Sequence, residues 1–219
     1  MYAGKEPRPC AQEAAYATSI PVLFALAKIM TAGRYLIYVA GLIGFAYLVF
    51  RVVVRRDYRK HGKLRIVASM MQLLAFAALF SFPYLFLPPS WPWFWRLPGT
   101  ASHAVQSLGA VLISLGFLTA FGTMAWFGIG KAFGYSVSGL TQSGPYRLSR
   151  NPQILGGYLL IIGTAIQWFS LYAYGWILLY ALIAHWMVIT EEEHLQRVFG
   201  SAYEAYCAEV PRYIPGPRR

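Results

Sequence analysis

Acidic residues are missing from most of this chain, and none occurs between Asp57 and Glu191. An ionised carboxylate at the centre of a bilayer costs at least ~2.5 kcal/mol, so a long stretch without carboxylates is what hydrocarbon surroundings require. The 219 residues include 8 acidic and 19 basic side chains, 58% are hydrophobic, and the mean hydropathy is +0.47. These values argue against an ordinary soluble domain and predict a polytopic integral membrane protein.

Cysteine is also scarce, with only Cys10 and Cys207 in the chain. The membrane topology that the basic residues predict places these two cysteines on opposite sides, so no intramolecular disulfide is expected. Their number and spacing match no metal-binding or redox motif, and no metal site is predicted. The first residues lack a cleavable apolar core, so no signal peptide is expected.

Apolar runs long enough to cross about 30 Å of hydrocarbon as helices predict an all-α fold. Five spans are expected, at 35–54, 66–87 and 104–130 and as two helices within 153–190 that reverse around 168–175. Residues 19–33 are apolar but shorter and include Lys28, which favours an interfacial or re-entrant helix over a sixth span. One domain is predicted, with an N-terminal segment (1–34), three membrane helices (35–130) and a C-terminal half (131–219).

Basic residues set the orientation of these spans. Seven lie close together between the first two spans, which predicts a cytoplasmic loop there: Arg51, Arg55, Arg56, Arg59, Lys60, Lys63 and Arg65. The alternation then puts the N-terminus outside and the C-terminus inside. The net charge of +11 is explained by this topology and by anionic lipid headgroups, so no nucleic-acid partner is predicted.

One polar segment on the cytoplasmic side precedes the fourth span. Gly144-Pro145 predicts a turn, Asn151 is a favoured N-cap, and Pro152 suits the first helical position. Free backbone N–H groups at that helix start, together with Arg150, would form an anion site. The alternative is ordinary capping with an arginine that serves only topology.

The second polar segment begins with three consecutive glutamates. Apolar residues recur behind them at helical spacing and predict one stripe, formed by Leu195, Phe199, Ala202 and Tyr206. Glu191 and Glu192 lie on the stripe side and are expected to face the protein. Glu193 has Arg197 four residues later and is expected to form a solvated pair.

A ligand that needs carboxylates, an anion site and an apolar wall is S-adenosylmethionine, although other zwitterions would also fit. Its ammonium and ribose hydroxyls suit glutamates, its carboxylate suits an arginine or a helix start, and its sulfonium tolerates aromatic faces.

The same residues resemble the isoprenylcysteine carboxyl methyltransferase family, whose superfamily includes phospholipid N-methyltransferases. The resemblance covers roughly residues 120–215. Its motifs are Gly144-Pro145-Tyr146, Arg150-Asn151-Pro152-Gln153-Ile154-Leu155-Gly156, Glu191-Glu192, Phe199-Gly200, Tyr203, Tyr206 and Val210-Pro211-Arg212.

The resemblance implies a cytosol-facing S-adenosylmethionine pocket that the C-terminal segment closes. It implies cofactor-binding roles for Tyr146, Asn151, Pro152, Leu155, Gly156, Glu191, Glu192, Tyr203 and Tyr206, with Arg150 and Arg212 as catalytic candidates. Gly128-Ile129-Gly130 could match the Gly-x-Gly of the phospholipid branch, but glycine pairs in membrane helices also serve packing.

Several of these assignments have an alternative. Tyr203 and Tyr206 could pack in the core, and Arg212 could contact only lipid headgroups. His185 precedes Glu192 by seven residues on the same helical face and is a further cofactor-binding candidate, but it could instead be a neutral histidine hydrogen-bonded within the bundle.

The chain departs from the family pattern at two positions. Asn151 replaces the usual histidine and Ile154 the usual tyrosine. Asparagine can cap a helix and donate a hydrogen bond, but it cannot carry a proton, so the acid or base role of that histidine is absent here.

The sequence thus predicts a multi-pass membrane methyltransferase with its active site facing the cytoplasm. Its acceptor would be lipidic or a small apolar molecule with a carboxylate, amine or thiol. Membrane lipids are the other expected partners. The competing functions are an NADPH-dependent membrane reductase, because membrane sterol reductases share this C-terminal architecture, and a non-catalytic binding or transport module.

Overall fold

The computed structural model describes residues 30–86, 102–128 and 139–214. The chain forms two compact units, Met1–Gly41 and Leu42–Arg219, and the second holds the helical bundle. Every regular element in the described residues is helical. The all-α prediction is therefore confirmed.

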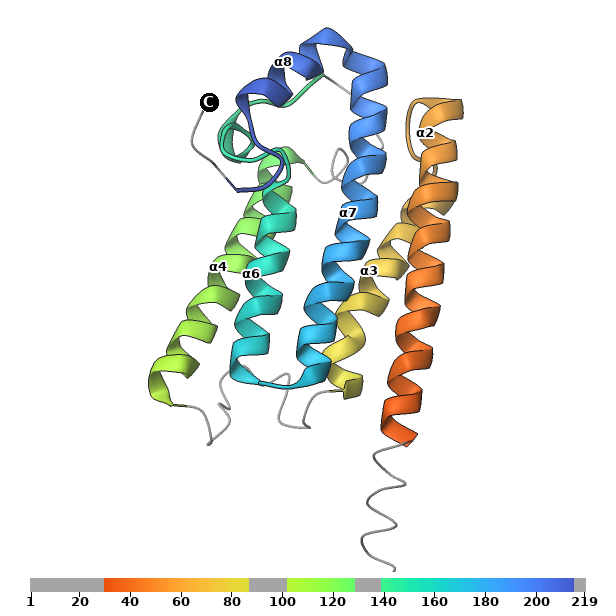
Figure 1. Ribbon diagram of the computed structural model, residues 1–219. Helices are drawn as coiled ribbons and strands as arrows, with labels where there is room; N and C mark the ends of the chain where they lie inside the picture. The colour runs from red at the N-terminus through yellow and green to blue at the C-terminus, as the bar shows by residue number, and fades with distance from the viewer. Residues whose placement is uncertain (1–29, 87–101, 129–138, 215–219) are drawn as a thin grey trace, which may run out of the picture. The chain divides into compact units, whose positions relative to one another are not determined.

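The helices succeed one another along the chain (Figure 1). A helix over Met30–His61 contains a π-helical stretch, η1 (Leu48–Val54), and ends as α2 (Arg55–His61). The remaining elements are α3 (Ile66–Phe86), α4 (His103–Phe127), the 3₁₀ turn η2 (Gly144–Arg147), α6 (Pro152–Gln167), α7 (Leu171–Phe199) and α8 (Ser201–Glu209).

Within the described residues, four helices are long and apolar enough to cross a membrane, which fits an integral membrane protein. They are Met30–His61, His103–Trp126 within α4, and the whole of α3 and α7. The fifth predicted span is present as α6, which has 16 residues and is about 24 Å long, shorter than the ~30 Å hydrocarbon layer. The apolar runs thus located all five helices, but α6 is too short to cross the layer without local thinning.

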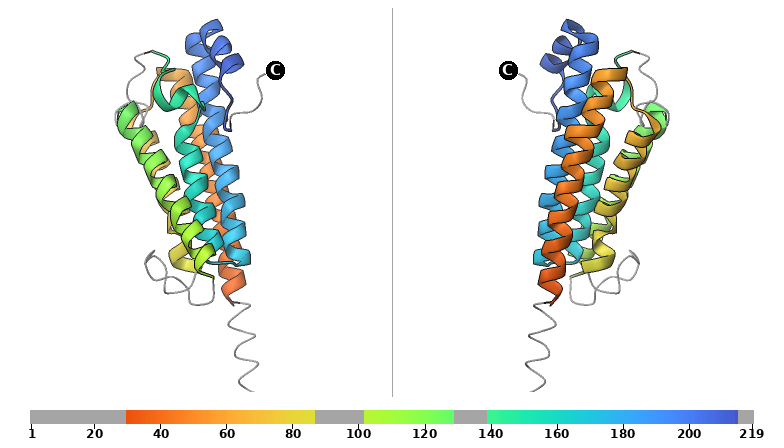
Figure 2. Two further views of the ribbon diagram at one scale, coloured as in Figure 1. Left: turned by 90° about the vertical axis from the view of Figure 1, so that its left-hand side faces the viewer. Right: turned by 90° about the vertical axis from the view of Figure 1, so that its right-hand side faces the viewer.

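Helices α4 and α6 are neighbours in the bundle (Figure 2). They pack closely because glycines remove side chains from their interface. A Cβ on Gly116 would lie 2.6 Å from the backbone nitrogen of Leu160, and one on Gly156 would lie 2.5 Å from that of Ala120. Lipid tails are as apolar as leucine, so close van der Waals packing of small residues is what holds membrane helices together.

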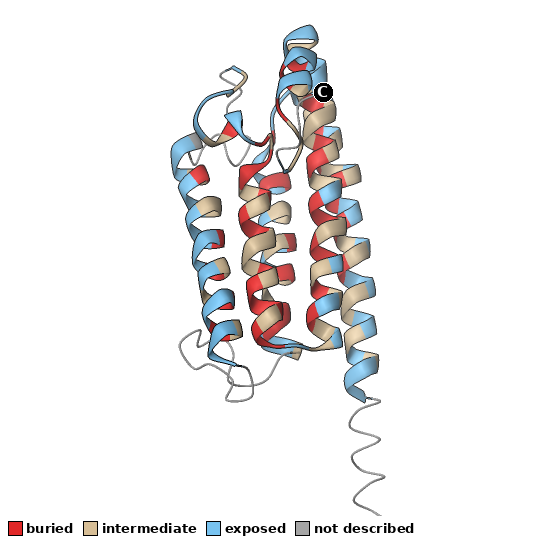
Figure 3. Cartoon of the chain, turned by 60° about the vertical axis from the view of Figure 1, so that its left-hand side comes forward, coloured by how far each residue is buried: buried red, intermediate tan, exposed pale blue. Residues whose placement is uncertain are grey.

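Helix α7 packs against α3, with Trp176 fully buried between them. Its indole nitrogen donates to the carbonyl oxygen of Leu79 at 2.9 Å, and its ring stacks on Phe82 with centroids 5.9 Å apart. The outward faces of α4 are exposed, as expected for lipid contact (Figure 3).

The reversal between α6 and α7 is shorter than predicted. It occupies residues 168–170, because the hydroxyl of Ser170 accepts a hydrogen bond from the backbone of Ala173 at 3.1 Å and starts α7 there. The predicted apolar stripe after the glutamates is also interrupted. Gly200 has φ 50°, a conformation that favours glycine, so α7 ends before it and the side chain of Ala202 is exposed.

The expected interfacial helix at 19–33 falls almost entirely outside the described residues. Only its last positions, from Met30 onward, are described, and they belong to the helix Met30–His61.

Candidate functional site

Four segments meet at the end of the bundle where α6 begins and α7 leaves its apolar stretch (Figure 1). We call this the polar end: residues 139–152, 190–199, α8 and the tail 210–214. A small cavity of about 60 Å³ lies within it. Its lining residues are Gly139, Leu140, Thr141, Tyr146, Arg150, Asn151, Glu191, Glu192, Leu195, Tyr203 and Tyr206.

Glu192 is the centre of an ion-pair network in this cavity. Its Oε1 is 2.9 Å from Nη1 of Arg150 and accepts from Nε of Arg212 at 3.0 Å, while its Oε2 accepts from Nη2 of Arg212 at 2.6 Å. The side chains of Arg150 and Glu192 are each 14% exposed, whereas that of Arg212 is 40% exposed. Glu192 therefore joins a largely shielded arginine to one that reaches solvent.

The C-terminal tail is fastened across the start of α6 by its backbone. The backbone nitrogen of Arg150 donates to the carbonyl oxygen of Pro211 at 2.9 Å. The carbonyl oxygen of Arg212 accepts from Nδ2 of Asn151 at 3.1 Å and from the hydroxyl of Ser149 at 3.3 Å. This strap brings Arg212 onto Glu192 at the cavity, in the place where the resemblance implied a closing segment.

The predicted helix start is present, but the side chain of Asn151 does not cap it. Asn151 occupies the N-cap position and Pro152 the first position of α6, yet Asn151 makes no side-chain cap and instead holds the tail. The guanidinium of Arg150 points to Glu192, Tyr203 and Cys207. Nη1 of Arg150 is thus engaged by the protein's own carboxylate, and the anion site at this helix start stays a prediction.

Glu191 differs from its neighbour. It lines the cavity, and among the described residues the structure shows no hydrogen bond or ion pair to its carboxylate. Its carboxylate lies close enough to Tyr58 and Tyr146 to interact with both phenols electrostatically. Nε of Arg150 is likewise buried without a partner in the described part of the chain. Unpartnered polar groups are costly in such surroundings, so both groups are candidates for contact with a ligand.

The tyrosines of the cavity remain protonated. Burial raises the pKa of Tyr146 well above its ordinary value, and the charge of Glu191 adds to this. Burial, with the charge of Glu192, raises the pKa of Tyr203 in the same way, and burial raises the pKa of Tyr206 to about 12. The hydrogen bond from Arg212 to Glu192 raises the pKa of that guanidinium. The cavity thus presents neutral phenols beside the ion pairs that Glu192 makes with Arg150 and Arg212.

The prediction for Glu193 was wrong in its partner. Its carboxylate does not pair with Arg197, which donates only to the Glu193 carbonyl oxygen at 3.4 Å. Instead Nη2 of Arg51 and Nε of Arg55 bind the carboxylate at 3.0 and 2.6 Å. These arginines lie 142 and 138 residues earlier in the chain, so local helical spacing could not reveal them.

Four of the predicted cofactor residues do not line the cavity. Pro152 is buried at the first turn of α6, Leu155 is half-buried on that helix, and Gly156 faces α4. His185 is exposed two turns before the glutamates. Of the Gly-x-Gly segment, Gly128 ends α4 and residues 129–130 lie outside the described ranges.

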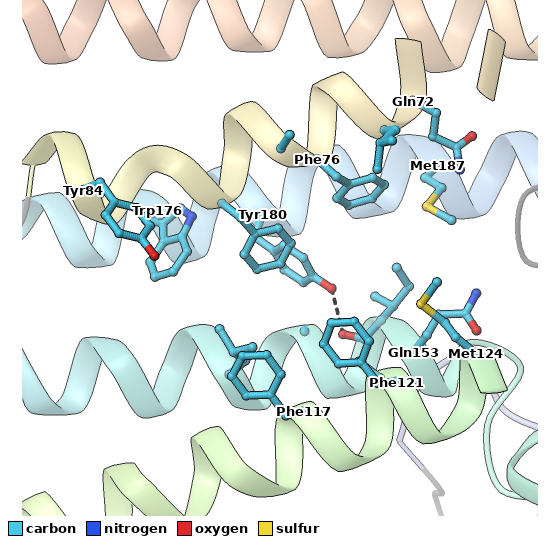
Figure 4. A pocket seen from close by; sticks show the side chains of 17 residues that line it. Gln72, Phe76, Tyr84, Phe117, Phe121, Met124, Gln153, Trp176, Tyr180 and Met187 are labelled. Atoms are coloured by element: carbon cyan, nitrogen blue, oxygen red, sulfur yellow. Dashed lines mark hydrogen bonds between the residues drawn. The ribbon is translucent and has the colours of Figure 1, made fainter. Parts of the chain in front are cut away.

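A much larger apolar chamber of about 530 Å³ lies among α3, α4, α6 and α7 (Figure 4). Aromatic and aliphatic side chains form most of its wall, including Phe76, Phe121 and Tyr180. Figure 4 shows Gln72, Met187, Gln153 and Met124 together at one end, and Tyr84 and Trp176 toward the other.

The chamber and the polar cavity share a wall. The hydroxyl of Tyr146, in the cavity lining, donates to Oε1 of Gln153, in the chamber lining, at 2.8 Å. On α7, Met187 in the chamber lies one turn before Glu191 in the cavity. Sequence reasoning did not single out Gln153 or Gln72 as site residues, although each is an amide in an otherwise uncharged apolar run.

Comparison with known families supports the resemblance. Residues 104–202 match the model of a family described as phospholipid methyltransferase. No curated protein and no solved structure matched. The matched region runs from α4 into α8 and contains η2, the start of α6 and the glutamates. Over residues 104–202 the chain is therefore similar to the phospholipid methyltransferase family, as the resemblance implied.

Proposed function

We propose that this protein is an S-adenosylmethionine-dependent membrane methyltransferase that methylates a lipidic or small apolar acceptor. One observation carries the proposal: a cavity containing two carboxylates and an arginine shares a wall with an apolar chamber of about 530 Å³. A polar methyl donor and an apolar acceptor need such neighbouring compartments.

The polar residues fit this cofactor chemically. The carboxylate of Glu191 can accept hydrogen bonds from its ammonium or ribose hydroxyls, and the buried Nε of Arg150 can donate to its carboxylate. Bound there, S-adenosylmethionine supplies a methyl group on a positively charged sulfur. Its binding would satisfy groups that lack a partner in the described structure.

The cavity is too small for the whole cofactor. A volume of about 60 Å³ holds a few water molecules. The strap beside it is held to Glu192 through the partly exposed Arg212. We infer that the tail 210–214 withdraws to admit the cofactor and returns to Glu192 afterwards.

The chamber would hold the methyl acceptor. Its volume lies within the ~300–1,000 Å³ of small-molecule sites, and its apolar wall excludes water from the reacting groups. Methyl transfer is an in-line displacement that depends mainly on alignment. A carboxylate acceptor needs no base, whereas an amine or thiol must react deprotonated, and Asn151 cannot take up its proton.

Calorimetry of the purified protein with S-adenosylhomocysteine and with NADPH tests the cofactor. The proposal expects saturable binding of S-adenosylhomocysteine and its loss in Glu191→Gln. Binding of NADPH alone would contradict the proposal and favour a reductase.

The proposed cytoplasmic orientation has its own test. Cys207 lies on α8 at the polar end, whereas Cys10 falls outside the described residues. An impermeant thiol reagent applied to intact cells should label Cys10 and spare Cys207. Labelling of Cys207 would contradict this orientation.

A further inference from the structure

The last turns of α7 are joined to the helix Met30–His61 by a row of directional contacts. At one end of the row, Tyr47 meets Trp186 edge to face with centroids 5.3 Å apart. At the other, Tyr58 stacks on His194 at 4.1 Å with planes 8° apart. Residue numbers increase together along the two helices, so they run parallel at this contact.

The centre of the row is charged. Arg51 donates from Nη1 to the hydroxyl of Thr190 at 3.0 Å and from Nη2 to Oε1 of Glu193 at 3.0 Å. Arg55 donates from Nε to Oε2 of Glu193 at 2.6 Å. Thr190 and Glu193 are three residues apart and share one face of α7. We call Arg51, Arg55, Thr190 and Glu193 the clamp.

The clamp fixes which way the neighbouring glutamates point. Successive residues of an α-helix are separated by about 100°, so Glu192 and Glu191 lie about 100° and 200° around the helix from Glu193. With Glu193 held toward Arg51 and Arg55, Glu192 reaches Arg150 and Glu191 lines the cavity.

The hydrogen bond from Trp176 to Leu79 orients α7 about four turns before Thr190. At the last turns of the helix, direction is set by the polar contacts of Thr190 and Glu193. Two hydrogen-bonded ion pairs to one carboxylate have a defined direction and reach. They are partly shielded, with side chains 17%, 32% and 33% exposed for Arg51, Arg55 and Glu193.

We propose that Glu193, held by Arg51 and Arg55, is a positioning residue that sets the rotation of α7 and so aims Glu191 and Glu192 at the cofactor cavity. This inference rests on the proposed function for its consequence in catalysis. Its structural content, the rotation of α7, can be measured without any ligand.

The ligand-free test uses Glu191→Cys as a reporter in the purified full chain. Alkylation by iodoacetamide is followed by mass spectrometry, which counts each cysteine separately. Adding Glu193→Gln, or independently Arg55→Gln, should change the alkylation rate at position 191 several-fold. The matched control is Arg56→Gln, which removes the same charge from the next, exposed residue and should leave the rate unchanged.

The ligand test measures binding of S-adenosylhomocysteine with the native Glu191. Glu193→Gln should raise Kd about tenfold, which corresponds to ~1.4 kcal/mol. It should raise KM for the methyl donor more than it lowers kcat, and Glu193→Asp, which keeps the charge, should recover part of the affinity. Arg56→Gln should bind normally.

The outcomes separate the clamp from the proposed function. Unchanged alkylation at position 191 in both Glu193→Gln and Arg55→Gln overturns the clamp, whatever the binding data show. The clamp is also overturned if Arg56→Gln changes the alkylation rate at position 191 as much as Glu193→Gln and Arg55→Gln do. If the native protein binds no S-adenosylhomocysteine, the proposed function fails, while the alkylation rates still decide whether the clamp sets the rotation of α7.

Discussion

Glu192→Gln is the substitution with the largest expected effect at the polar end. The native carboxylate faces Nη1 of Arg150 at 2.9 Å and two nitrogens of Arg212 at 3.0 and 2.6 Å. A neutral amide keeps the shape but removes the negative charge. Two guanidinium groups would then meet no anion at this position.

The magnitude of the loss depends on burial. A hydrogen bond to a charged group contributes about 1.5–3 kcal/mol. Arg212 is 40% exposed, so water replaces much of what it loses. Arg150 and Glu192 are each only 14% exposed, so their contact is the one that solvent cannot restore. We therefore expect Glu192→Gln to weaken the contact with Arg150 by ~2 kcal/mol, a value in the lower part of that range.

Proteolysis and calorimetry both measure this loss. Release of Arg212 should free the tail, so trypsin should cleave after Arg212 several-fold faster in Glu192→Gln than in the native protein. The affinity for S-adenosylhomocysteine should fall about tenfold, or ~1.4 kcal/mol, because Glu192 would no longer order Arg150 and the tail around the cavity.

Glu204→Gln is the matched control, because Glu204 is an exposed glutamate whose described contact is a 2.7 Å hydrogen bond from Gln196. It should match the native protein in both assays. Equal cleavage after Arg212 in the native protein, Glu192→Gln and Glu204→Gln would show that Glu192 does not hold the tail.

Three further substitutions test the arginine, the helix interface and the chamber. Arg150→Lys should weaken S-adenosylhomocysteine binding about tenfold, because lysine lacks the planar fork of donors; normal calorimetric affinity would show that Arg150 does not hold the cofactor. Gly156→Ala should destabilise the protein by ~1–3 kcal/mol in thermal unfolding, because its Cβ would lie 2.5 Å from the α4 backbone, whereas Gly122→Ala has open space and should not. Ala77→Trp should fill part of the chamber and reduce methyl transfer while leaving S-adenosylhomocysteine binding intact, with the outward-facing Leu118→Trp as control. Equal turnover in these two variants would mean that the chamber does not hold the acceptor.

The sequence was sufficient to predict the membrane helices and to predict that Glu191 and Glu192 face the protein. Apolar length and the absence of carboxylates located the membrane helices, because hydrocarbon imposes those constraints on any sequence. Helical phase placed Glu191 and Glu192 toward the protein, where both line the cavity. It could not identify their partners, since Arg212 reaches Glu192 only after the chain turns at Gly200 and folds back.

Helical phase also fails where the neighbours of a helix change along its length. His185 lies seven residues before Glu192 and so points in a similar direction, yet it is exposed. At the level of Glu192 the tail covers that face of α7. Two turns earlier on α7, none of the described segments covers the face on which His185 lies.

The partners of Glu193 were beyond sequence reasoning for another reason. Arg51 and Arg55 were assigned to topology, because positive charge at the cytoplasmic end of a span needs no further explanation. Only the packing of two distant helices shows that these arginines bind one carboxylate.

Methyl transfer by the purified protein is the decisive measurement for the proposed activity. The protein would be incubated with S-adenosylmethionine carrying a labelled methyl group and with a lipid extract, and the organic phase would be analysed for label. We expect a labelled apolar product that is lost in Glu191→Gln and kept in Glu204→Gln. If the native protein binds S-adenosylmethionine but labels no apolar molecule, the chamber is not an acceptor site and the proposed function is wrong.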